Sequence, residues 1–158
     1  MAAARRAVPS RSQHAVVELL RAANRCKTLF THEIEPHGIT GQQYNVLRIL
    51  RGAGPEGVPM LAIAARMVER TPGITRIIDR LERENLVVRE RLGGDRRRVH
   101  ARITPKGLDI LERLDRPVEL ATRAAIAGLT SSEIASLIGL LERIAGPARR
   151  GRRGRKQH

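Results

Sequence analysis

The stretch TPGITRIIDRLERENLVVRERLGGDRRRVHARITPKG, residues 71–107, is the most informative part of the sequence, because its apolar spacing changes from helical to strand-like along its length. In the first half, apolar residues recur at i, i+3, i+4 and i+7, which predicts an amphipathic helix. These residues are Ile74, Ile77, Ile78 and Leu81. Thr71 is typical of an N-cap and Pro72 of a first helical residue, so we expect the helix to begin there. The face opposite the apolar stripe presents Pro72, Arg76, Asp79 and Arg83.

Two β-capable runs follow, residues 87–92 and 98–103, and a glycine-rich turn separates them. This arrangement predicts a β-hairpin. Residues 89–102 contain six arginines against two acids, so the hairpin is strongly basic. A guanidinium at a thin projecting tip can enter a narrow minor groove of DNA. Asp95 lies two residues before Arg97 and is placed to hold that side chain.

A short helix expected over residues 60–68 precedes the amphipathic helix. Together they make a helix-turn-helix, whose second helix fits a DNA major groove. Small Ala64 suits the close crossing of the two helices.

Two more helices are predicted upstream. A capping box at residues 10–13 predicts the start of a long helix that ends at Glu35, and a capping box at residues 40–43 predicts the start of a short second helix.

Residues 52–59, GAGPEGVP, predict a loop with a strand residue at Val58. Downstream we expect a helix from Pro105 to about Ala127, kinked at Pro117. A third capping box at residues 130–133 opens a last helix that stops at Gly146-Pro147. The sequence therefore predicts a mainly α fold of six helices with a small β-wing.

The composition favours a polyanionic partner. The formal net charge is +14, and six basic residues between positions 149 and 156 supply +6, which leaves +8 on the rest. Such a surface favours phosphate contact and counterion release. With one Tyr, one Phe and no Trp, the chain is poorly suited to stack on unpaired bases, and its core must be aliphatic.

Other functional classes find little support. No catalytic arrangement stands out, and the histidines lack metal-ligand spacing, so we expect no enzyme, metal site or cofactor. No apolar run is long enough to span a bilayer, and the first residues lack a secretory signal. The single cysteine, Cys26, fits a reducing cytoplasm, where we expect the protein to act.

Candidate DNA-binding residues lie on the second helix of the helix-turn-helix and at the hairpin tip. Thr75 and Arg76 are placed to reach phosphates or base edges, and Gly73 removes side-chain bulk beside them. Arg83 has the alternative of pairing with Asp79 or Glu82. The full set is Thr71, Pro72, Gly73, Thr75, Arg76, Arg80, Arg83, Asp95, Arg96, Arg97 and Arg98.

The span from about Ser10 to Pro147 resembles the MarR family of winged-helix regulators. The resemblance rests on IAARM (63–67), ITRIIDRLERENLV (74–87) and GGDRRRVHARITPKG (93–107), in this order and spacing. It implies a homodimer joined by the first, fifth and sixth helices, a pseudo-palindromic DNA site, and a small molecule that relieves DNA binding. It also implies that Arg97 enters the minor groove and that Asp95 orients it.

The chain departs from the family pattern at three places. Glu69 occupies the turn where the family usually has an apolar residue, and the 52–59 loop is longer and richer in glycine and proline than expected. The oxidation-sensing branch carries its cysteine near Val16, ten residues before Cys26, so peroxide sensing is not supported.

These observations predict a bacterial transcriptional regulator, a repressor released by a small-molecule effector. We expect a flexible basic arm at residues 1–9, a helical dimerisation region at 10–38 and 105–147, a winged helix-turn-helix domain at 39–104 and a disordered basic tail at 148–158. One alternative is a charge-driven nucleoid-type or RNA-binding protein. Another is a protein–protein adaptor that reuses the winged helix, which the basic hairpin disfavours.

Overall fold

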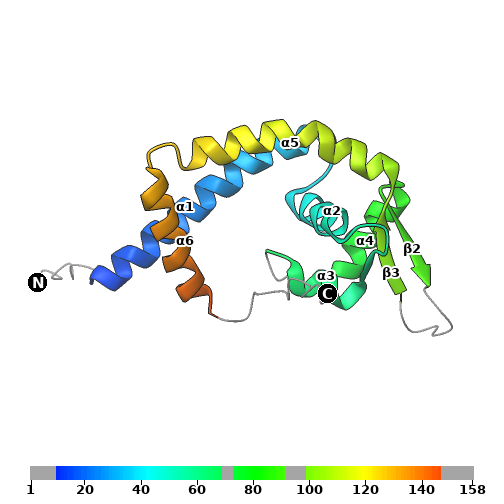
Figure 1. The fold of residues 1–158 in the computed structure, drawn as a ribbon, viewed down its shortest axis with the longest axis horizontal. Helices are drawn as coiled ribbons and strands as arrows, with labels where there is room; N and C mark the ends of the chain where they lie inside the picture. The colour runs from blue at the N-terminus through cyan, green and yellow to red at the C-terminus, as the bar shows by residue number, and fades with distance from the viewer. Residues whose placement is uncertain (1–9, 69–72, 92–98, 147–158) are drawn as a thin grey trace, which may run out of the picture.

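The computed structural model describes residues 10–68, 73–91 and 99–146. Six helices and a small sheet follow one another in the predicted order, so the mainly α fold class is confirmed (Figure 1). The helices are α1 Arg11–Ile34, α2 Gly41–Ala53, α3 Met60–Arg66, α4 Ile74–Arg83, α5 Pro105–Ala125 and α6 Ser131–Ala145, with a 3-10 turn over Glu35–His37. The strands are β1 Val58–Pro59, β2 Val87–Arg91 and β3 Val99–Ile103.

All three predicted capping boxes form. Ser10, Thr40 and Thr130 each accept a hydrogen bond from the backbone N–H three residues on, and the side chains at those positions cap the N-cap backbone in return. Each box satisfies two backbone donors that the first helical turn leaves without partners. The starts of α1, α2 and α6 are therefore fixed by local sequence.

The predicted hairpin and the strand residue at Val58 are confirmed. The antiparallel sheet has the order β1-β3-β2, with Val87 opposite Ile103 and Val58 opposite Ala101. Gly57 has a φ of +66°, and a Cβ there would lie 2.6 Å from the Ala101 carbonyl oxygen. The 52–59 loop thus packs closely against β3.

The predicted start of α4 is wrong by two residues. The helix begins at Ile74, and its N-cap is Gly73, which has a φ of +113° and makes no side-chain cap. That left-handed backbone places the first residue of α4 after Gly73. Thr71 and Pro72 themselves lie outside the described residues.

Two other helix ends also differ from prediction. Helix α3 stops at Arg66, because Met67 is extended, and α5 stops at Ala125, where Ile126 leaves the helical region. Pro117 lies inside α5, which remains one continuous helix and follows a bowed path in Figure 1. No described helix has the length and apolarity needed to cross a membrane.

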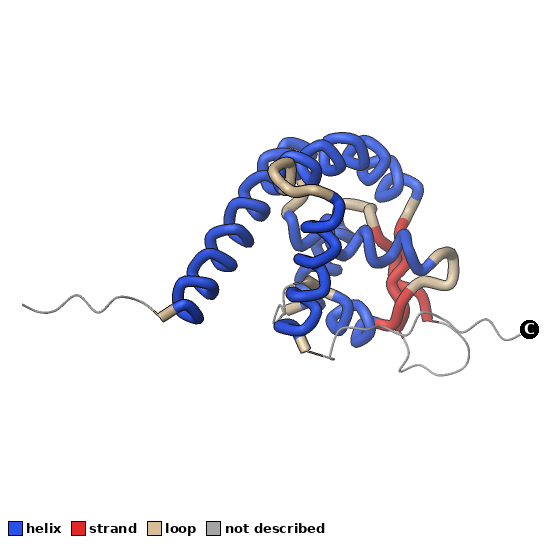
Figure 2. The backbone as a smooth tube through the Cα atoms, turned by 60° about the vertical axis from the view of Figure 1, so that its left-hand side comes forward, coloured by secondary structure: helices blue, strands red, loops and turns tan. Residues whose placement is uncertain are grey.

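One mainly aliphatic core joins the end of α1, α2, α3, α4, the sheet and α5 as far as Val118, and Tyr44 is its one buried aromatic residue within the described ranges. Its fully buried members include Leu47, Ile63, Ile78, Leu81, Leu111 and Leu114. Helices α1 and α5 pack side by side along much of their length (Figures 1 and 2). Helix α6 turns back from the end of α5 and carries no buried residue.

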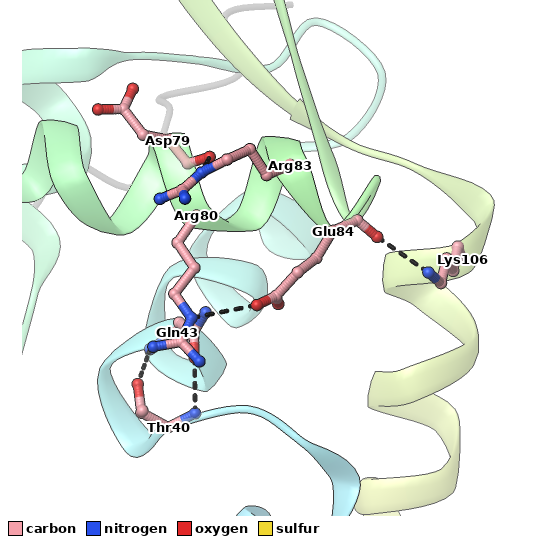
Figure 3. Close-up of polar contacts among 7 residues, drawn as sticks. All are labelled: Thr40, Gln43, Asp79, Arg80, Arg83, Glu84 and Lys106. Atoms are coloured by element: carbon pink, nitrogen blue, oxygen red, sulfur yellow. Dashed lines mark hydrogen bonds and ion pairs between the residues drawn. The ribbon is translucent and has the colours of Figure 1, made fainter.

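The end of α4 is fastened to the start of α5. Lys106 Nζ donates to the Glu84 carbonyl oxygen at 2.9 Å (Figure 3), where a cation also favours the negative end of the α4 dipole. Thr104 caps α5 and donates its hydroxyl to the Asn85 carbonyl oxygen at 2.8 Å. A Cβ on buried Gly107 would lie 2.5 Å from the Leu86 carbonyl oxygen, so only glycine permits this approach.

A second link joins α2 to the middle of α5. Arg51 donates two parallel hydrogen bonds to Asp115, each 2.8 Å long. The hydrogen bonds from Arg51 hold the pKa of the Asp115 carboxyl below its ordinary value, so the carboxyl stays ionised at neutral pH. Helix α5 is therefore linked to the winged-helix part of the chain at two places, through Lys106 at its start and through Asp115 at its middle.

The contact at Gly107 predicts a specific stability difference. Gly107→Ala should lower the free energy of unfolding by about 1–3 kcal/mol, because the added methyl meets the Leu86 carbonyl and Ile103. Gly128→Ala is the matched control, since nothing lies within 4 Å of its added methyl. Urea unfolding at equal protein concentration measures the free energy of unfolding of both variants. Equal values would contradict the close packing of Gly107 against the Leu86 carbonyl.

Candidate nucleic-acid interface

Helix α4 is anchored through the apolar stripe that the sequence predicted. Ile78 and Leu81 are fully buried, while Ile74 and Ile77 are partly buried against the same core. The helix contacts α2, α3 and β2. Burial of one face fixes which residues the opposite face presents to solvent.

The exposed face of α4 is basic. Thr75, Arg76, Arg80 and Arg83 are all exposed, and the three arginines follow one another at spacings of four and three, so they share one side of the helix. Gly73 is exposed at the same end as Thr75 and Arg76. The structure thus brings together the five predicted site residues of α4 that it describes.

The α4 arginines make few contacts with the rest of the protein. Arg80 Nε lies 3.1 Å from a Glu84 carboxylate oxygen, and Arg83 Nε donates to the Asp79 backbone carbonyl oxygen at 3.3 Å (Figure 3). Arg76 has no hydrogen-bond or ion-pair partner within the part of the chain that the structure describes. Exposed pairs of this kind contribute little to stability, so these guanidinium groups can be redirected to a ligand.

Arg89 of β2 forms a bridge to α4. Its guanidinium pairs with Asp79, lies 3.2 Å from a Glu82 carboxylate oxygen and donates to the Thr75 carbonyl oxygen at 3.3 Å. Its backbone N–H also donates to Glu82, at 3.2 Å. We call this set of contacts the Arg89 bridge. It holds two turns of α4 against the hairpin strand.

The bridge also decides the charge of the exposed face. Asp79 and Glu82 are the only acids within α4, and both are paired with Arg89. The alternative that Arg83 pairs with either carboxylate is therefore wrong, since Arg83 bonds only to the Asp79 backbone. Because Arg89 engages both acids, neither of them pairs with Arg76, Arg80 or Arg83, and these arginines present a positive surface suited to a polyanion.

The hairpin stands beside α4. Strands β2 and β3 lie next to the helix, and their ends that lead toward the hairpin tip point away from α5 (Figure 1). Arg102 pairs with Glu90 across these two strands. The predicted tip residues Asp95, Arg96, Arg97 and Arg98 lie outside the described residues, as do Thr71 and Pro72. For these six positions the site assignment remains a prediction.

Sequence reasoning missed the residues that position the site. Arg89 was counted only as one more hairpin arginine, and Lys106 was not identified as the residue that holds the end of α4. A usable signal existed for Arg89, because a cation on the strand that follows an acid-bearing helix can reach back to it. Within the described ranges, no group of His, Cys, Asp and Glu side chains has a metal-binding arrangement.

Comparison with known proteins places these features in context. A sequence profile of the MarR family matches residues 37–98. The homoprotocatechuate degradative operon repressor of Escherichia coli is 29% identical over 126 residues, which cover 80% of this chain and 84% of that protein.

Two solved structures of transcription regulators are also similar to this chain. A MarR transcription factor from Planctomyces limnophilus is 36% identical, with a TM-score of 0.66 over 85% of this chain and 98% of that one. The PcaV transcriptional regulator from Streptomyces coelicolor, determined in complex with its natural ligand, is 26% identical, with a TM-score of 0.77 over 90% of this chain and 99% of that one.

The Arg89 bridge predicts unequal effects of two identical substitutions. Arg89→Gln should lower the free energy of unfolding by about 1–2 kcal/mol, because it leaves Asp79 and Glu82 without their cation. Arg83→Gln removes the same charge from an exposed position with one local bond, so it should cost less than about 0.5 kcal/mol. Urea unfolding measures the free energy of unfolding of the two variants. If both lose the same stability, the Arg89 bridge is not the link between α4 and β2.

Proposed function

Because this chain belongs to the MarR family of transcriptional regulators, we propose that it is a homodimeric repressor that binds pseudo-palindromic duplex DNA and is released by a small molecule. The observation that carries the proposal is the exposed arginine face of α4, while the two acids of that helix are both paired with Arg89. Residues 39–104 form the DNA-binding domain in this proposal, and residues 10–38 and 105–147 form the dimerisation region.

In the proposed complex, α4 lies in the major groove, which admits one helix. Arg76 contacts a base edge or phosphate from the first turn, with Thr71, Pro72, Gly73 and Thr75 beside it. Arg80 and Arg83, farther along the helix, contact phosphates.

The hairpin occupies the adjacent minor groove in this proposal. Arg97 enters that groove, and Asp95 orients its side chain. Arg96 and Arg98 add phosphate contacts on either side. The described strands support this arrangement, because they stand beside α4 and lead to the tip that carries these residues.

Unpartnered apolar side chains support the homodimer. They include Leu20 on α1 and Leu120 on α5, and Ile138, Leu140 and Ile144 on α6, which are 52–69% exposed. Large apolar side chains that are more than half exposed favour burial by a partner. In the proposal a second copy covers α1, α5 and α6, and the two-fold axis then places two α4 helices against two half-sites.

Two relatives support the regulatory part of the proposal. The Escherichia coli relative is named as an operon repressor, and the Streptomyces coelicolor relative was determined with its natural ligand. In this chain, the fastening of α4 to α5 and the Arg51–Asp115 link supply a mechanical connection between the two regions. A ligand that shifts α5 would therefore shift α4.

DNA binding is tested by fluorescence anisotropy on a duplex from the region upstream of the protein's own gene. Arg76→Gln and Arg97→Ala should each weaken binding about tenfold or more, because a bidentate arginine contributes on the order of 1–3 kcal/mol. Arg123→Gln removes an exposed arginine of α5 that pairs with Glu119, and it should leave the affinity nearly unchanged.

The same titration separates the proposed function from its alternative. At about 150 mM salt the wild-type chain should prefer its own site over a shuffled duplex by about 1,000-fold. Equal affinity for the two duplexes, with all three variants weakened alike, would favour a nucleoid-type protein that uses charge alone.

The dimer is tested by light scattering coupled to size exclusion. Ile138→Glu together with Ile144→Glu should convert the dimer to a folded monomer, because both carboxylates would be buried at the interface. Ser132→Glu lies on the side of α6 away from Ile138 and Ile144 and should remain dimeric. A wild-type monomer, or a dimer that survives the double substitution, would contradict the proposed interface.

A further inference from the structure

The side chain of Asn45 connects α2 to the turn between α3 and α4. Its Oδ1 atom, in the second turn of α2, accepts a hydrogen bond from the backbone N–H of Val68 at 3.1 Å. Val68 follows Met67, the residue at which the backbone leaves the helical path of α3. The contact therefore joins α2 to the first part of the turn, 23 residues farther along the chain.

Asn45 is itself held in a fixed position. It is half-buried, and its neighbours Tyr44 and Val46 are buried in the core. Helix α2 lies in the middle of the winged-helix part of the chain, where it packs against α3, α4 and α5 (Figure 1). An asparagine side chain is short, so the position of α2 defines where the donor of this hydrogen bond lies.

The first turn of α4 begins at a residue that cannot cap it. Gly73 is the N-cap of α4 and has no side chain to accept a hydrogen bond. Ile74 and Ile77 of this turn are only partly buried, whereas Ile78 and Leu81 farther along are fully buried. The position of the first turn therefore depends on contacts that other elements provide.

Two elements, β2 and α2, restrain this end of α4. From β2, Arg89 donates to the Thr75 carbonyl oxygen at 3.3 Å. From α2, Asn45 holds Val68, and four residues separate Val68 from Gly73. Four residues span a short distance, so a fixed Val68 limits where Gly73 can lie.

The residue type at position 45 fits such a tertiary role. Asparagine is less favourable than alanine inside a helix, so it does not serve the stability of α2 by itself. Its carbonyl oxygen instead serves a backbone N–H outside its own helix. Replacement by alanine removes this acceptor while it improves the helix propensity of α2.

We infer that Asn45 is a positioning residue for DNA recognition: by holding the turn, it sets where Thr75 and Arg76 stand against the bases. The inference rests on the proposed function, and Asn45 itself need not contact DNA. Base contacts carry the sequence preference and depend on close placement, whereas phosphate contacts carry little sequence information. Loss of the acceptor should therefore reduce the preference for the correct duplex more than it reduces DNA binding in general.

The test measures the affinity of the full chain for the duplex from its own upstream region and for a shuffled duplex, by fluorescence anisotropy. In Asn45→Ala the ratio of the two affinities should fall about fivefold, as expected for the loss of one neutral hydrogen bond. Asn45→Asp keeps the Oδ acceptor and should retain the wild-type ratio within about twofold, because its added negative charge weakens binding to both duplexes alike. Asn24→Ala makes the same change at an exposed position of α1 and should leave the ratio unchanged.

Amide hydrogen exchange tests the contact in the absence of DNA. The Val68 amide should exchange about fivefold faster in Asn45→Ala than in the wild type or in Asn45→Asp, because it loses this acceptor. Circular dichroism and thermal unfolding check that each variant folds. If Asn45→Ala does not fold, Asn45→Gln takes its place, since it moves the amide oxygen one methylene farther from α2.

A wild-type preference that survives unchanged in Asn45→Ala would overturn this inference alone. An equal loss of preference in Asn45→Asp would also overturn it, because the acceptor would then not be the cause. The same holds if the Val68 amide exchanges equally fast in all three proteins. Equal affinity of the wild-type chain for the two duplexes would overturn the proposed function, and this inference with it.

Discussion

The Arg89 guanidinium holds α4 at a fixed position relative to β2, and this constraint decides both the geometry and the charge of the candidate interface. One partly buried side chain reaches Thr75, Asp79 and Glu82, which span two turns of the helix. The helix cannot rotate to present another face without breaking these contacts and exposing Ile78 and Leu81. Because the same contacts engage both acids of α4, neither acid pairs with Arg76, Arg80 or Arg83, and the exposed face keeps an excess of positive charge for a polyanion.

The position of α4 is passed on to α5 through tight backbone contacts. Gly107 allows the start of α5 to approach the Leu86 carbonyl, and Lys106 and Thr104 bond to the last carbonyls after α4. The four residues Thr104-Pro105-Lys106-Gly107 thus each have a separate physical role, as N-cap, first helical residue, cation for the end of α4 and point of close approach. In the proposed dimer, this junction sets the distance between the two copies of α4.

The sequence predicted those features that depend on local chemistry. Helical and strand periodicity located all six helices and the hairpin, and hydroxyl–amide or hydroxyl–carboxylate pairs three residues apart marked three helix starts. The start of α4 was missed because Gly73 adopts a left-handed backbone, which overrides the proline signal before it. The Arg51–Asp115 link and the Arg89 bridge were also missed, since pairs separated by 64 and 10 residues depend on tertiary packing that periodicity does not encode.

In the proposed complex, α4 and the hairpin tip engage neighbouring grooves of one duplex. A crystal structure of the chain bound to DNA from its own upstream region would show whether they do. We expect two chains per site, each with α4 in the major groove and residues 92–98 in the adjacent minor groove of the same half-site. A complex in which the arginines of α4 face away from the DNA, or in which the hairpin tip does not reach the duplex, would contradict it.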